Sequence, residues 1–190
     1  MSGLRVIAGT ARGRRLRSVP GDTTRPITDR VKESLFDILG GDIQSANFLD
    51  LFAGTGSVGI EALSRGAAFA RFIDKESQAV ATVRVNLETT GLKGSADIVK
   101  ADTFAYLARP ADRSFDYAYI APPQYKSLWK RALLSLDAHP DWLSRDAWVV
   151  VQIYPGELEA LELKNLVEFD QRKYGSTLLV FYSRVVTGQR

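Results

Sequence analysis

The sequence predicts an α/β fold built on a mostly parallel seven-stranded β-sheet. Between residues 47 and 154, short apolar runs typical of strands alternate with segments whose apolar residues recur at helical spacing. Several strand runs are apolar at consecutive positions, as expected when helices cover both faces of a parallel sheet. Residues 166–184 differ, because two β-rich runs separated by Tyr174-Gly175-Ser176 predict an antiparallel hairpin that closes the sheet.

The N-terminal segment predicts a β-hairpin that carries arginines. Residues 4–8 and 14–19 alternate in the manner of strands, and the glycine-containing run 9–13 separates them. A helix follows, with Thr28 as its N-cap, Asp29 in its first turn and Gly40-Gly41 at its end. The glycine pair suggests a boundary between an extension, residues 1–40, and a main domain, residues 41–190.

The main domain predicts strands and helices in alternation. The expected strands are 47–52, 69–74, 96–102, 115–121 and 148–154, and the expected helices begin near residues 57, 76, 103 and 128. Each of the three tryptophans lies within or beside an apolar run, so we expect Trp129, Trp142 and Trp148 in the core.

Composition excludes several classes of protein. The chain of 190 residues has no cysteine, which rules out disulfides, thiolate metal sites and a cysteine nucleophile. No apolar run has the length of a signal peptide or a membrane span, so we expect a cytoplasmic protein with no membrane partner. No metal-ligand cluster or Ser-His-Asp set is evident, and the single histidine, His139, lies in a polar loop. We expect a monomer that uses no metal.

Positive charge is concentrated at the N-terminus. Residues 1–32 contain eight Lys or Arg and two Asp, whereas the whole chain has a net charge of +3, so the other 158 residues carry −3. Such a basic segment on a mildly acidic body indicates a site for a polyanion, although a solvated, disordered arm would have the same composition. The candidate RNA-binding residues are Arg12, Arg14, Arg15, Arg17 and Arg25.

The glycine-rich stretch after the first strand predicts a nucleotide-cofactor site. Gly54, Gly56 and Gly59 satisfy G-x-G-x-x-G between a strand and a helix, and Asp74 ends the next strand twenty residues after Gly54. A carboxylate in that position can hold the hydroxyls of a ribose. On this motif alone the cofactor is a nucleoside compound of open identity, NAD included.

Two further carboxylates favour a cofactor other than NAD. Asp50 stands four residues before Gly54, where it would repel a pyrophosphate but attract the ammonium of a methionine group. Asp102 is expected to end the third strand, facing an adenine amino group. Together with Asp74, these acids would lie on the sheet edge where ligands bind in such folds.

The loop after the fourth strand, Ala121-Pro122-Pro123-Gln124-Tyr125, is a candidate substrate site. The two prolines stiffen the loop and leave carbonyl oxygens as acceptors for an amino group. Gln124 and Tyr125 could hydrogen-bond to and stack on a flat heterocycle. For the two prolines taken alone, a rigid strand-to-helix turn is the preferred interpretation.

Four motifs together resemble the bacterial RsmD family. They are TRPITDRVKESLF at residues 24–36, LDLFAGTGSVGIEALSRGA at 49–67, FIDKE at 72–76 and IAPPQY at 120–125. The resemblance implies a Rossmann-like class I methyltransferase that transfers a methyl group from S-adenosylmethionine to the exocyclic N2 of a guanine. The implied substrate is 16S ribosomal RNA, free or in an assembling small subunit.

The resemblance also assigns roles to individual residues. It implies that Asp50, Gly54 and Gly56 line the methionine end of the cofactor, that Asp74 holds the ribose, and that Asp102 and Thr103 lie at the adenine. The candidate cofactor-binding residues are Asp50, Phe52, Gly54, Gly56, Asp74, Lys75, Asp102 and Thr103. The candidate catalytic residues are Ala121, Pro122, Gln124 and Tyr125.

The sequence departs from the family at position 121. The family motif has Asp or Asn before the two prolines, followed by an aromatic residue, whereas this chain has Ala121 and places Tyr125 one position late. Alanine cannot accept a hydrogen bond from the target amine, which is expected to slow the reaction rather than abolish it. A relative that binds cofactor and RNA without turnover, or an NAD-dependent oxidoreductase, are the alternatives.

Overall fold

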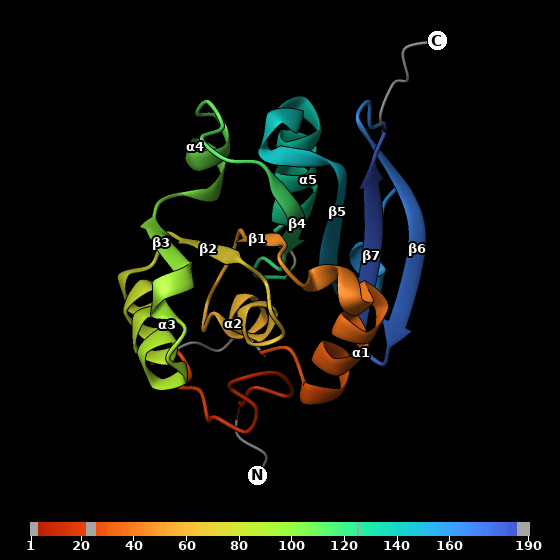
Figure 1. The fold of residues 1–190 in the computed structure, drawn as a ribbon. Coiled ribbons are helices and arrows are strands. Elements are labelled where there is room, and N and C mark those ends of the chain that lie inside the picture. The colour runs from red at the N-terminus through yellow and green to blue at the C-terminus, as the bar shows by residue number, and fades with distance from the viewer. Residues whose placement is uncertain (1–3, 22–25, 125, 186–190) are drawn as a thin grey trace. The chain divides into compact units, whose positions relative to one another are not determined.

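The computed structural model describes residues 4–21, 26–124 and 126–185. Arg25 and Tyr125, two of the candidate site residues, lie outside these ranges. The chain divides into two compact units, one ending at Asp102 and the other starting at Thr103 (Figure 1).

The first unit contains three parallel strands and the helices that pack on them. Its strands are β1 (Asn47–Asp50), β2 (Phe69–Asp74) and β3 (Ala96–Lys100), with β2 between the other two. Its α-helices are α1 (Asp29–Leu39), α2 (Ser57–Ser64) and α3 (Ser77–Thr90), and short 3-10 helices occupy Gly40–Ile43 and Lys93–Ser95. Parallel pairing brings the carboxyl ends of β1, β2 and β3 to one edge, as the sequence predicted.

The predicted helix boundaries have clear local causes. The Thr28 hydroxyl accepts a hydrogen bond from the Val31 amide and caps α1, which ends at Gly40 with a positive φ. The α3 helix ends at Gly91, which adopts the left-handed conformation. The third strand is shorter than predicted, because it ends at Lys100 and leaves Asp102 two residues beyond it.

The second unit contains a mixed sheet. Its strands are β4 (Phe115–Ile120), β5 (Leu143–Ile153), β6 (Leu166–Tyr174) and β7 (Thr177–Arg184). The β4 and β5 strands pair in parallel, and β7 lies antiparallel between β5 and β6. The helices are α4 (Thr103–Leu107) and α5 (Leu128–Ala138), with 3-10 turns at Pro140–Trp142 and Pro155–Glu157. The predicted fold class, a mostly parallel seven-stranded α/β fold with an antiparallel C-terminal hairpin, is confirmed.

The core prediction for the tryptophans is correct for two of three. Trp129 and Trp142 are each 1% exposed, and the Trp142 indole donates to the Leu107 carbonyl. Trp148 is only half-buried, and the centroid of its ring lies 4.8 Å from that of the exposed Phe169 on strand β6. An apolar run therefore predicted a strand correctly but not the burial of each side chain in it.

The N-terminal hairpin is short and irregular. Arg5 and Arg15 form a single antiparallel bridge, and hydrogen bonds between Val6 and both Gly13 and Arg14 close the turn. In Figure 1 this red segment runs along α2 and α3 of the first unit. We call residues 5–17 the basic arm.

Candidate functional site

Asp50 lies at the end of β1 in a fully buried position. Its side chain is 2% exposed, and among the described residues its Oδ1 atom has no hydrogen-bond partner. The pKa of Asp50 is raised from 3.8 to about 7, mainly by burial and also by the nearby Asp74 carboxylate, although hydrogen bonds from the Gly59 and Phe52 backbone oppose the rise. A buried acceptor without a partner is unfavourable in the free protein, so Asp50 is a candidate to accept a hydrogen bond from a ligand.

None of the three motif glycines near Asp50 can be replaced without strain, and Gly54 has φ +54°. Gly56 has φ +76°, a conformation that side chains other than glycine rarely adopt. A Cβ atom on Gly59 would lie 2.4 Å from the Phe72 ring, so this glycine allows α2 to pack against β2. Gly59 is therefore required for the packing of α2 against β2, and the role of the loop in ligand binding stays a prediction.

Asp74 connects the end of β2 to the glycine loop. Its Oδ2 accepts a hydrogen bond from the Gly54 amide at 2.9 Å, and its Oδ1 accepts one from the Glu76 amide at 2.9 Å. The carboxylate is half-buried, and each of its oxygens can accept a further bond. Asp74 thus braces the loop and keeps acceptor capacity for a ligand.

The other candidate cofactor residues differ in exposure. Phe52 is half-buried, Lys75 is exposed and pairs with Glu76 at 3.8 Å, and Asp102 is exposed just after β3. Thr103 is buried, and it is the first residue of α4. Contacts that join Asp50, Gly54 and Asp74 bring these three predicted residues together, and the remaining assignments stay predictions.

The proline segment follows β4 directly. Ala121 and Pro122 are half-buried, whereas Pro123 and Gln124 are exposed. The next helix, α5, begins four residues after Gln124, and Ser127 before it has a positive φ of 51°. The segment is therefore a short connection between β4 and α5, and its catalytic role is a prediction.

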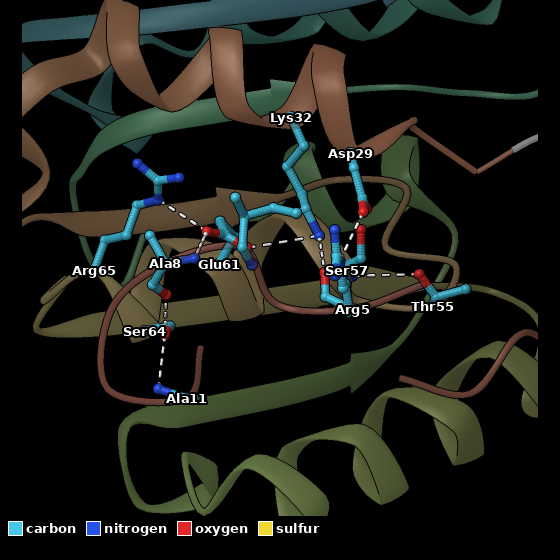
Figure 2. Close-up of polar contacts among 11 residues, drawn as sticks. Arg5, Ala8, Ala11, Asp29, Lys32, Thr55, Ser57, Glu61, Ser64 and Arg65 are labelled. Atoms are coloured by element: carbon cyan, nitrogen blue, oxygen red, sulfur yellow. Dashed lines mark hydrogen bonds and ion pairs between the residues drawn. The ribbon is translucent and has the colours of Figure 1, made fainter. Parts of the chain in front are cut away.

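The basic arm is held against α2 by two side chains that the sequence analysis missed. The Glu61 carboxylate accepts hydrogen bonds from the Ile7 and Ala8 amides at 2.8 and 3.0 Å. The Ser64 hydroxyl donates to the Ala8 carbonyl at 2.6 Å and accepts from the Ala11 amide at 3.0 Å (Figure 2). The arm is an ordered part of the first unit, so the alternative of a disordered arm is wrong.

Glu61 is also the centre of a buried ionic cluster. Lys32 Nζ lies 3.6 Å from its Oε2, and Arg65 Nε donates to its Oε1 at 2.8 Å (Figure 2). Lys32 and Glu61 are both 0% exposed, and Lys32 also donates to the Arg5 carbonyl at 2.6 Å. Burial lowers the pKa of Lys32, an effect that the Glu61 charge opposes. A charged residue inside an otherwise apolar α2 was the available signal for this cluster.

The candidate arginines of the basic arm are exposed, unlike the side chains that anchor the arm. Arg12, Arg14, Arg15 and Arg17 are all exposed, while their neighbours Ala11 and Leu16 are buried. The structure therefore presents four cations from one ordered turn. Arg25, the fifth candidate, lies outside the described residues.

Comparison with known proteins identifies the family. A family model described as Conserved hypothetical protein 95 matches residues 4–183. The chain belongs to this family. Its members include relatives named ribosomal RNA small subunit methyltransferase D, so the RsmD resemblance seen in the sequence motifs is confirmed.

Individual relatives and solved structures match most of the chain. YlbH of Bacillus subtilis is 38% identical over 184 residues, which are 95% of this chain and 99% of that protein. The ribosomal RNA small subunit methyltransferase D of Escherichia coli K12 is 34% identical over 149 residues, which are 78% of this chain and 74% of that protein. The solved structure of Escherichia coli yhhF is 31% identical, with a TM-score of 0.85 over 96% of this chain and 98% of that one.

The described residues, 4–21, 26–124 and 126–185, contain neither a membrane-spanning helix nor a metal-ligand cluster. No helix in these ranges is both long and apolar enough to span a membrane. No group of three or more His, Asp or Glu side chains in the same ranges could hold a metal ion.

Proposed function

We propose that this protein transfers a methyl group from S-adenosylmethionine to the exocyclic N2 of a guanine in 16S ribosomal RNA. Family membership supports methyl transfer to small-subunit ribosomal RNA, because members of the family carry that name. Guanine N2 is the finer part of the proposal and follows from the motif resemblance. The single structural observation that supports the cofactor is the buried Asp50 oxygen without a partner.

Asp50 fits the ammonium of the cofactor's methionine group. A cation beside this carboxylate would supply the missing donor. It would also favour the ionised form of Asp50, which the raised pKa of about 7 disfavours in the free protein. Binding would then release a proton near neutral pH. A pyrophosphate at the same place would instead meet a buried acid, which disfavours NAD.

The remaining cofactor contacts are proposed from position. Asp74 would hold the ribose through its free acceptor capacity, Gly54 and Gly56 would admit the methionine backbone, and Asp102 with Thr103 would lie at the adenine. Phe52 and Lys75 would flank the ligand on either side of the glycine loop. S-adenosylmethionine supplies the electrophilic methyl group when bound.

The proline segment would orient the target amine. The Pro122 carbonyl would accept a hydrogen bond from the guanine N2 group and so aim its lone pair at the methyl carbon, with Gln124 and Tyr125 holding the base. Methyl transfer is an in-line displacement that depends mainly on positioning, so a strong base is not required. Because Ala121 offers no side-chain acceptor, we expect a lower turnover rate than in members with Asp or Asn at this position.

The basic arm would bind RNA phosphates. Its exposed arginines carry planar guanidinium groups that pair well with phosphate, and the anchoring by Glu61 and Ser64 fixes their spacing. This assignment makes the arm an interface for the RNA rather than for the cofactor.

The experiment that tests the proposal is methyl incorporation. The protein would be incubated with S-adenosylmethionine labelled on its methyl group and either 16S RNA transcribed in vitro or small subunits that lack the modification. We expect label in one guanine of one of these substrates, with N2 identified by nucleoside mass spectrometry. Absence of label from both substrates would contradict the proposal.

A catalytically impaired relative is the second candidate, and Ala121 is the observation that favours it. The variant A121D restores the acceptor that the family motif has, so we expect a higher turnover rate with little change in cofactor affinity. Activity in A121D together with none in the parent protein would favour the impaired relative.

Calorimetry with NAD and with S-adenosylhomocysteine tests the oxidoreductase alternative. Preferential binding of NAD would support that alternative.

A further inference from the structure

Asn86 joins the basic arm to the glycine loop. It lies in α3 and is 0% exposed. Its Oδ1 accepts a hydrogen bond from the Arg17 amide at 2.7 Å, and its Nδ2 donates to the Arg17 carbonyl at 3.0 Å and to the Thr55 carbonyl at 2.8 Å. One side-chain amide therefore holds the backbone of two segments that are 38 residues apart in the sequence.

The three hydrogen bonds use both donors of the amide and one acceptor site. The partners also fix its orientation, because a backbone N–H must face the oxygen and two carbonyls must face the nitrogen. Asparagine is a poor residue for a helix interior, where its side chain competes with the backbone. Its presence in the middle of α3 is explained by these contacts rather than by helix formation.

Each end of this connection leads to one of the proposed ligands. Arg17 is exposed, so its guanidinium is presented outward while its backbone is clamped. The Thr55 carbonyl belongs to the same peptide plane as the Gly56 amide, which donates to the Ala53 carbonyl at 2.7 Å. Asn86 thus fixes the peptide plane at the centre of the proposed cofactor loop.

We infer that Asn86 is a positioning residue that couples RNA binding at the arm to cofactor binding at the glycine loop. The inference rests on the proposed function for the identity of the two ligands. A ligand that orders one segment also orders the other through the shared amide, so the second ligand has less conformational entropy to remove. Binding of each ligand therefore strengthens binding of the other by the same factor.

The primary experiment measures this factor in the wild-type protein. The dissociation constant of unmodified 16S RNA is measured with and without saturating S-adenosylhomocysteine, and that of S-adenosylhomocysteine with and without RNA. We expect both ratios to agree at about five-fold or more. If both ligands bind and the ratios equal one, the inference is wrong; if either ligand fails to bind, it is the proposed function that fails.

The variant N86D tests the residue itself. The carboxylate introduced in this variant can still accept a hydrogen bond from the Arg17 amide. It places an acceptor, however, opposite the two carbonyls that receive hydrogen bonds from Asn86 in the wild-type protein. We expect the coupling ratio to fall to about one while each ligand still binds alone. The matched control is T82A, because Thr82 is 6% exposed in the same helix and its hydroxyl donates only within the helix, to the Gln78 carbonyl at 2.8 Å.

Two outcomes separate coupling from a merely structural role. If T82A and N86D have similar thermal stability and both lose coupling, the effect belongs to the stability of α3 and the inference is wrong. The inference is also wrong if N86D keeps the coupling ratio of the wild type. If N86D does not fold, hydrogen exchange of the wild-type protein serves instead. RNA alone should then slow exchange of the Gly56 and Ser57 amides, and unchanged exchange of both amides in the RNA-bound protein would overturn the inference.

Discussion

Replacing Asp50 with asparagine should remove a pH dependence from the stability of the protein. Burial raises the pKa of Asp50 in the folded state to about 7, from an ordinary value of 3.8. The folded protein therefore holds this proton more tightly than the unfolded chain does. The contribution of Asp50 to the free energy of unfolding is therefore fully present below about pH 4 and is lost as the pH rises toward about 7. Above about pH 7, the free energy of unfolding no longer changes with the titration of this group.

The size of the effect follows from the two pKa values. A difference of about 3 between them corresponds to roughly 4 kcal/mol over the full range, since one pKa unit equals about 1.4 kcal/mol. When the pH is raised from 4.5 to 7.5, the titration of Asp50 should lower the free energy of unfolding by about 3 kcal/mol. Asparagine has the same shape and does not titrate, so D50N lacks this contribution.

Urea unfolding followed by circular dichroism measures the effect. Wild type, D50N and the control D42N, which changes an exposed acid in the same unit, are compared at pH 4.5 and 7.5. The difference in unfolding free energy between D50N and wild type should move by about 3 kcal/mol in favour of D50N as the pH rises. Parallel pH profiles for D50N and wild type would refute the assignment of a raised pKa to Asp50.

Two further predictions concern the glycine loop and the arm. The variant G59A should lower the free energy of unfolding by about 1 to 3 kcal/mol, because its Cβ would lie 2.4 Å from the Phe72 ring. The control G94A, where no atom lies within 4 Å, should leave it unchanged, and equal chemical denaturation curves for the two variants would contradict the packing argument. Replacing three arm arginines together (R12A/R14A/R15A) should weaken RNA binding and reduce the slope of log affinity against log salt by about 1 for each lost phosphate contact. Cofactor affinity should be unchanged by calorimetry, and an unchanged RNA affinity would remove the arm from the interface.

The parts of this structure that the sequence predicted are those with local causes. The cap at Thr28 and the helix stop at Gly40 each depend on residues near one another in the chain. Asp50 was also predictable, because its distance from the glycine loop placed it at the end of β1. Position in the motif gave its location, whereas its missing partner emerged only from the packing around it.

The polar contacts that anchor the arm could not be predicted in the same way. Glu61 holds backbone amides that precede it by 54 and 53 residues, and Asn86 holds Arg17 across 69 residues. No periodicity in the sequence specifies such a partner, because these side chains bind backbone atoms that every residue has. A buried charge or amide inside a helix signals that some partner exists without saying which.

These anchors change how the N-terminal charge should be counted. Of the basic residues in the first 32, Lys32 faces the buried Glu61 and Arg5 is paired with Asp29 at 2.9 Å, so neither is a free cation for RNA. The charge that remains on the arm comes from its four exposed arginines, which a turn fixed to α2 holds together. The salt dependence of RNA binding should accordingly reflect about four contacts from the arm rather than the larger number that composition alone suggests. Because the turn is anchored to the same helix that begins at the glycine loop, the position of those arginines is set by the element that also shapes the proposed cofactor site.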